Sequence, residues 1–156
     1  MNWENLFLQF ILSYASTVCF GILLHIPARA YNMAGIIGGG VWEIYWLIYY
    51  HHHVGLAISN LLAAILISLF SMAAARHLKM PMIVFNVPAL VTFVPGGQAY
   101  KMVRNFALGN YPLAMFYLYQ VIVIVGAITL GFGLGELIIR AVKYIHTLSK
   151  SSKSKV

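Results

Sequence analysis

The chain of 156 residues is 62% apolar and only 8% charged, and its mean hydropathy is +0.85. An average soluble domain is about 45–50% apolar and about 25% charged, so this composition excludes a cytosolic globular domain and a disordered chain. The single cysteine, Cys19, cannot form a disulfide within the chain, which excludes a disulfide-stabilised secreted domain. The sequence therefore predicts one all-α integral membrane domain over residues 1–145.

The net charge of +7 is concentrated towards the end of the chain. Residues 146–156 are rich in serine and lysine, which predicts a basic, disordered cytoplasmic tail. Anionic lipids at the cytoplasmic surface attract such a tail. Because the charge lies beside a membrane segment, we expect no binding to nucleic acid. The basic residues near the end of the chain are Arg140 and Lys143, just before the tail, and Lys150, Lys153 and Lys155 within it.

Five apolar segments are long enough to be membrane spans, since a helix needs roughly 20 mostly apolar residues to cross the hydrocarbon core. The fourth contains prolines at positions 81, 88 and 95, so we expect its helix to be broken by proline and glycine. The five segments are Asn5–Ala28, Ala30–Tyr50, Val54–Ala75, Met80–Tyr100 and Asn105–Gly135.

The basic residues of the loops predict the orientation, because Lys and Arg accumulate on the cytoplasmic side of a membrane. With five crossings, Arg29, Arg76 and Lys79 lie on the same side as the basic tail. Only Lys101 and Arg104 then lie on the opposite side, whereas four crossings would divide the charges evenly. We therefore expect five crossings of the cell membrane, with the N-terminus outside and the C-terminus in the cytoplasm.

The fourth segment carries the most informative residues. Prolines inside a helix leave carbonyls without a hydrogen bond, and in lipid these must be satisfied by protein or by water in a cavity. This favours a broken helix beside a polar path, and a proline-kinked packing helix is the alternative. Polar side chains in the segment could orient a small zwitterion. The candidate path residues are Asn86, Pro88, Thr92, Pro95, Gly96, Gly97, Gln98 and Tyr100.

The pairs Val87-Pro88 and Val94-Pro95, with Gly96 and then Tyr100, resemble the signature of the threonine/serine exporter family. The stretch from Ile26 to Arg29 and the glycine-rich run from Gly35 to Gly40 are similar to two further features of that family. Thr92 departs from the pattern, since relatives often have a proline there. The resemblance covers most of the chain and the C-terminal half of the full-length exporter. It implies a small five-span subunit that works with a larger membrane partner.

A few charged residues could take part in transport. Glu43 is the only acidic residue far from a predicted interface, and a carboxylate in hydrocarbon is costly. It could couple transport to protons or balance a substrate ammonium, and a structural role within the bundle is the alternative. Arg29, Lys101 and Arg104 could attract an anion or anchor the protein at the interface. Glu136 and Arg140, four residues apart, predict an ion pair on one helix face.

The three consecutive histidines, His51–His53, do not predict a metal site. Neighbouring residues on a helix point in different directions, and no cysteine or carboxylate lies close by in the sequence. We therefore expect neither a metal nor a cofactor. Glycines spaced four apart, Gly35 with Gly39 and Gly131 with Gly135, favour close helix contact. We expect these glycine faces to mediate assembly, with a partner or between copies of the chain.

The sequence lacks the residue patterns of an enzyme. It contains no aspartate, its cysteine and serines have no base nearby in sequence, and no G-x-x-x-x-G-K phosphate loop occurs. We therefore expect a subunit of a secondary exporter for threonine, serine or a related small carboxylated solute. The alternatives are a non-transporting structural or assembly subunit of a membrane complex and a subunit of a dicarboxylate (succinate-type) exporter.

Overall fold

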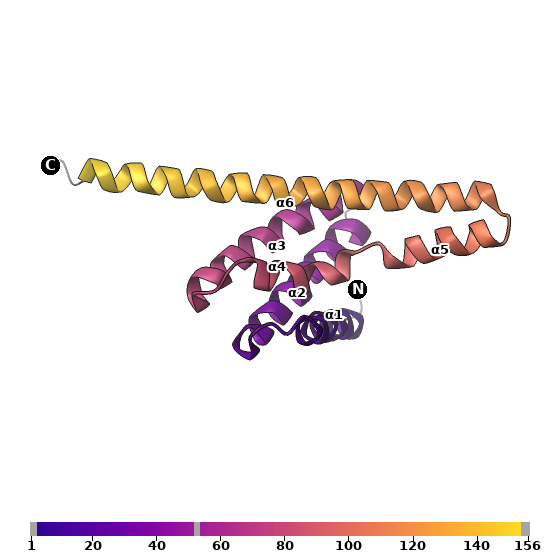
Figure 1. Ribbon diagram of the computed structural model, residues 1–156, viewed down its shortest axis with the longest axis horizontal. Coiled ribbons are helices and arrows are strands. Elements are labelled where there is room, and N and C mark those ends of the chain that lie inside the picture. Colours follow the sequence, from indigo (N-terminus) through magenta and orange to yellow (C-terminus); the bar gives the residue numbers. More distant parts are fainter. Residues whose placement is uncertain (1–2, 52–53, 154–156) are drawn as a thin grey trace.

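The computed structural model describes residues 3–51 and 54–153, with side chains for residues 6–50 and 54–144, and contains no strand in these ranges (Figure 1). This confirms the predicted all-helical fold. Short 3-10 segments precede α2 and follow α4, and a π-helical turn, Leu47–His51, continues α2. The α-helices are α1 (Trp3–Leu23), α2 (Tyr31–Trp46), α3 (Leu56–Leu78), α4 (Ile83–Leu90), α5 (Gly96–Ala107) and α6 (Tyr111–Lys153).

Three of the helices are long and apolar enough to cross a membrane: Leu6–Leu23, Leu56–Leu78 and Tyr111–Tyr144. They correspond to the first, third and fifth predicted spans. The second predicted span contains the 16 residues of α2 and all but the last residue of the π-helical turn that follows it. The number of crossings, five, stays a prediction.

The fourth predicted span is divided into two short helices, as expected. With 8 and 12 residues, α4 and α5 are about 12 and 18 Å long, so neither crosses a core of about 30 Å alone. Pro88 lies inside α4, and the helix breaks at Val94 and Pro95. Val94 has the extended backbone (φ −61°, ψ 131°) that a following proline favours, so Pro95 rather than Pro88 sets the break.

The chain reverses direction between α5 and α6, which lie side by side (Figure 1). Gly109 adopts a positive φ of 75° in this turn, a conformation that glycine allows at little cost. The Asn110 side chain accepts a hydrogen bond of 3.4 Å from the backbone N–H of Leu113. Asn105 belongs to α5, and the helix of the fifth predicted span, α6, begins at Tyr111, six residues later than predicted.

Helix α6 has 43 residues, about 64 Å of helix, and is much longer than one crossing requires. It continues through Lys153 into the tail, residues 146–156, for which we expected disorder; positions 154–156 lie outside the described residues. The sequence from Glu136 to Lys153 contains no glycine or proline that would end a helix. This explains why the helix continues past the apolar residues.

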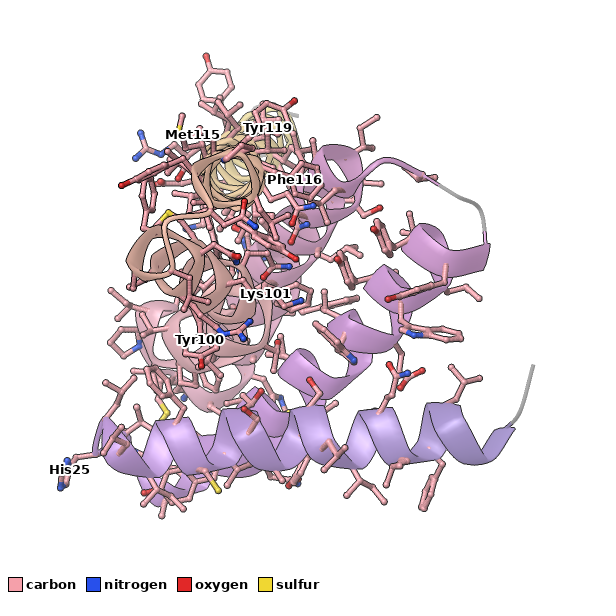
Figure 2. The ribbon with its side chains drawn as sticks, turned by 90° about the vertical axis from the view of Figure 1, so that its right-hand side faces the viewer. His25, Tyr100, Lys101, Met115, Phe116 and Tyr119 are labelled. Carbon is pink, nitrogen blue, oxygen red and sulfur yellow. The ribbon has the colours of Figure 1, made fainter. Side chains whose placement is uncertain are left out.

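Helix α4 lies at the centre of the packing, in contact with α1, α2 and α3, while α3 packs along α6. Its Phe85 and Ala89 side chains are fully buried, together with Val41 of α2 and Ile67 of α3. Helix α1 is nearly end-on in Figure 1, whereas Figure 2 shows it along its length with α6 end-on. The first helix therefore runs across the direction of the last one.

The four spaced glycines pack against helices of the same chain, which confirms the predicted close helix contact; the expectation that their faces mediate assembly is wrong for these four residues. A Cβ added at Gly35 would lie 2.5 Å from a ring carbon of Tyr14 in α1. One added at Gly131 would lie 2.6 Å from the Cβ of Ala64 in α3. The same holds for Gly39 against α1 and for Gly135 against α3. Since any larger residue would collide with these neighbours, the glycines set the spacing of two helix pairs.

Candidate functional site

A cavity of about 190 Å³ lies at the break between α4 and α5, and we call it the break cavity. Its walls come from α2, α3, α6 and the broken segment itself, so four distant parts of the sequence meet there. The lining residues are Trp42, Tyr45, Asn60, Thr92, Phe93, Val94, Pro95, Gln98 and Ile124.

A larger cavity of about 550 Å³, which we call the outer cavity, adjoins the break cavity. The two share Trp42, Tyr45, Thr92 and Gln98 in their walls. Helix α1 and the π-helical turn complete the outer cavity, whose further lining residues are Gln9, Leu12, Ser13, Trp46, Tyr49, Tyr50 and Leu56.

Three aromatic rings form one wall of the break cavity, and two of them, Trp42 and Tyr45, also line the outer cavity. The centroids of Trp42 and Tyr45 are 5.4 Å apart, and the Phe93 ring lies 5.6 Å from each of them. The Tyr45 and Phe93 rings meet edge to face, at an interplanar angle of 89°. Rings in such arrangements hold one another in place, and their faces attract cations. The wall can therefore contact an ammonium group or the apolar part of a small solute.

Hydrogen bonds fix several polar side chains around these rings. The Asn60 amide donates to the backbone carbonyl of Leu56 at 2.8 Å. The Thr92 hydroxyl donates to the carbonyl of Ala89 at 3.2 Å. The cavity thus combines apolar walls with a few positioned polar groups, which is typical of small-molecule sites.

The first turn of α5 adjoins the break cavity, since Pro95 and Gln98 line it. The N-terminus of a helix carries a partial positive charge that favours a carboxylate, and in α5 the first N–H, that of Gly96, donates to the carbonyl of Val94 at 2.7 Å. The arrangement therefore offers a place for an anion at the helix end and aromatic faces for a cation. An α-amino acid has both groups.

The structure brings together only part of the path predicted from the sequence. Thr92, Pro95 and Gln98 line the break cavity, whereas Pro88 is buried in the core beside it. Asn86 lines a different cavity. Gly96 and Gly97 are exposed at the start of α5, with no atom within 4 Å of an added Cβ, and Tyr100 is 69% exposed on the same helix (Figure 2).

The charged candidates lie away from the break cavity. Glu43 is half-buried in α2, and its Oε1 atom is buried without a hydrogen-bond partner among the described residues. Arg29 and Arg104 are exposed, and so is Lys101, whose ammonium lies 5.5 Å from the centre of the Tyr117 ring of α6. Lys101 therefore contributes to the contact between α5 and α6. None of these residues lines the break cavity.

The predicted ion pair is present, whereas the side chains of the three consecutive histidines lie outside the described residues. Within the described ranges, no group of three His, Cys, Asp or Glu side chains could hold a metal ion. His52 and His53, and the side chain of His51, lie outside the described residues. The predicted ion pair is present, with Arg140 Nη2 at 2.7 Å from Glu136 Oε1.

Sequence reasoning missed the aromatic wall and Asn60. The signal for the wall was present, because Trp42, Tyr45, Trp46 and Tyr49 follow the spacing of one helix face. No comparable signal existed for Asn60, which is one of several polar residues in an apolar helix. Only the packing of α3 against α2 shows that this residue borders the cavity.

Comparison with known proteins identifies the family. The model of the family described as "Threonine/Serine exporter, ThrE" matches residues 9–138, which include every residue that lines the break cavity. No curated protein and no solved structure matches the chain. The matched region extends from α1 through the first 28 residues of α6 and covers most of the chain. The chain therefore belongs to the threonine/serine exporter family of membrane transport proteins, as its resemblance to that family predicted.

Proposed function

We propose that this chain is a subunit of a secondary exporter that moves threonine, serine or a related small carboxylated solute out of the cell through the break cavity. The observation that carries the proposal is the cavity itself, which forms where Pro95 interrupts the helix. Broken helices of this kind supply free backbone groups to solutes within secondary transporters. The family membership supports the solute class.

The proposed recognition uses opposite sides of the cavity. The solute carboxylate lies at the N-terminus of α5, where the helix dipole favours negative charge. The ammonium lies against the Trp42 and Tyr45 rings, and Asn60, Thr92 and Gln98 offer polar atoms to its hydroxyl and ammonium groups. Transport of this kind involves no chemical reaction and is driven by a gradient. Glu43, with its unpartnered buried oxygen, is the candidate for proton coupling.

We also propose that transport requires a larger partner subunit of the same family. The chain resembles one half of the full-length exporter, and secondary transporters are commonly built from two related halves. The exposed apolar side chains along α6, such as Phe116 and Leu130, are compatible with either lipid or a partner helix.

Efflux from loaded cells tests the proposal. Cells that express both subunits should lose threonine faster than cells that lack either one. Thr92→Val and Tyr45→Phe, which each remove one hydroxyl from the break cavity, should slow this efflux severalfold. Thr129→Val is the matched control, because that hydroxyl is exposed on α6 and bonds only to the carbonyl of Val125 in its own helix.

The outcomes separate the alternatives. Efflux of succinate but not of threonine or serine would assign the chain to dicarboxylate export. Unchanged efflux in both cavity variants, at normal membrane abundance, would leave a structural or assembly role. Full efflux by this chain reconstituted alone would refute the need for a partner.

A further inference from the structure

A second polar cavity, of about 500 Å³, lies between α3, α4 and the C-terminal part of α6, and we call it the α6 cavity. Its volume is within the range of roughly 300–1,000 Å³ that is usual for small-molecule sites. Five polar or charged side chains contribute to its walls: Ser68, Asn86, Glu136, Arg140 and Lys143. None of these five residues lines the break cavity.

Two polar atoms in the wall of the α6 cavity are buried without a protein partner. Ser68 is 1% exposed, and its hydroxyl oxygen makes no hydrogen bond within the described part of the chain. The Oδ1 atom of Asn86 is also buried and unpartnered there. A buried polar group without a hydrogen-bond partner costs free energy, and native proteins contain few such groups. Both residues line one cavity, so a rotation about their side-chain bonds would present these oxygens to a polar ligand bound there.

The outer wall of the α6 cavity carries both signs of charge. Glu136 and Arg140 form an ion pair of 2.7 Å, and their side chains are 61% and 72% exposed. An exposed pair of this kind is weak and can rearrange around a ligand. A carboxylate could pair with Arg140, and an ammonium with Glu136. The charges are therefore complementary to a small zwitterion.

Helix α4 separates the two cavities. Its residue Asn86 lines the α6 cavity, and Thr92, six residues later in the chain, lines the break cavity. Between them, Pro88 and Ala89 are fully buried in the core. The two cavities are thus distinct sites on either side of α4, which a 3-10 segment, Val91–Phe93, joins to the break.

We propose that the α6 cavity is a second binding site for the transported zwitterion, with its carboxylate at Arg140 and its ammonium at Glu136 and Asn86. This inference rests on the proposed function. In the predicted orientation, the C-terminal part of α6 is the cytoplasmic end of the helix, so the α6 cavity lies where an exporter takes up its solute. A solute then passes α4 from the α6 cavity to the break cavity.

Threonine binding to the purified full-length chain in detergent tests the site, and the chain offers a matched pair of serines. Ser68→Ala should weaken binding about three- to tenfold, the effect of one lost hydrogen bond. Ser71→Ala is the control: Ser71 is equally buried and unpartnered, lies one turn further along α3, and does not line the α6 cavity. An equal effect of the two variants would overturn the proposal.

The charge assignment is tested with two threonine analogues. 3-Hydroxybutyrate keeps the carboxylate and lacks the ammonium, whereas 1-amino-2-propanol keeps the ammonium and lacks the carboxylate. Arg140→Gln should weaken binding of the first and spare the second, and Glu136→Gln should do the reverse. Arg76→Gln, an exposed change on α3 outside the α6 cavity, should alter neither. Equal effects of Arg140→Gln and Glu136→Gln on both analogues would contradict the assignment.

A lipid headgroup also carries an ammonium beside an anion and could occupy the α6 cavity. If the cavity binds the solute and not a lipid, threonine should bind equally in nanodiscs of phosphatidylcholine and in nanodiscs that also contain phosphatidylethanolamine. Competition by phosphatidylethanolamine that depends on Ser68 would assign the α6 cavity to a lipid and overturn the solute site. Threonine binding that responds to Thr92→Val and not to Ser68→Ala would reject the second site alone. A chain that binds no amino acid would refute the proposed function as well.

Discussion

The indole Nε1 of Trp42 donates a hydrogen bond to the side-chain Oε1 of Gln9, 3.1 Å away. Both residues line the outer cavity, one from α2 and the other from α1. The bond therefore joins the two helices at the wall of the cavity and holds the Trp42 ring beside Tyr45 and Phe93. A side-chain contact between residues 33 positions apart thus positions the aromatic wall of the site.

Trp42→Phe should lower the free energy of unfolding by about 1 kcal/mol, because it removes the donor and leaves the Gln9 carbonyl without it. Unfolding of the purified chain in detergent measures the change. Trp46→Phe is the control, since that ring lines the same outer cavity and its centroid lies 5.3 Å from that of Tyr50. Equal destabilisation by both substitutions would show that ring size, and not the hydrogen bond, matters.

Gly131→Ala should destabilise the contact between α3 and α6 by about 1–3 kcal/mol, because the added methyl would collide with Ala64 and with the carbonyl of Leu61. Gly126→Ala on the same helix should be neutral or slightly stabilising, since nothing lies within 4 Å of its added Cβ. Thermal unfolding of the two variants in one detergent gives the comparison. A stable Gly131→Ala protein would contradict the close helix contact.

Gly96→Leu should abolish efflux while the protein remains inserted and assembled. The space around Gly96 is open, so the larger side chain fits at the start of α5, yet it would obstruct a solute that approaches the helix end. Efflux, membrane abundance and partner co-purification are measured together, with Gly126→Leu as the control on open α6 surface. Normal transport by a well-expressed variant would remove Gly96 from the path.

The tail should be inaccessible from outside the cell. In a chain with Cys19 replaced, a Ser152→Cys variant should not react with a membrane-impermeant thiol reagent until the cells are opened. The reason is the distribution of Lys and Arg, which favours a cytoplasmic C-terminus. Efficient labelling in intact cells would reverse the predicted orientation.

The sequence alone determined the features that depend on residues close together along the chain. Apolar composition predicts the long helices, because lipid requires every backbone group to be paired within its own segment. Pro95, followed by two glycines, predicts the break, because a proline disfavours a helical conformation for the residue before it. The family pattern around Pro88 and Pro95 was also recognisable without a structure and is confirmed by the match over residues 9–138.

Only the tertiary structure decided which side chains share a cavity. Thr92 and Asn86 lie six positions apart in one predicted segment, yet they line separate cavities because the buried residues between them pack into the core. Asn60 of α3 joins the break cavity through packing against α2, and the glycines of α2 and α6 contact helices of the same chain. Helix periodicity predicts which residues share a face but not which helix that face contacts, since that choice depends on shape complementarity between segments far apart in the sequence.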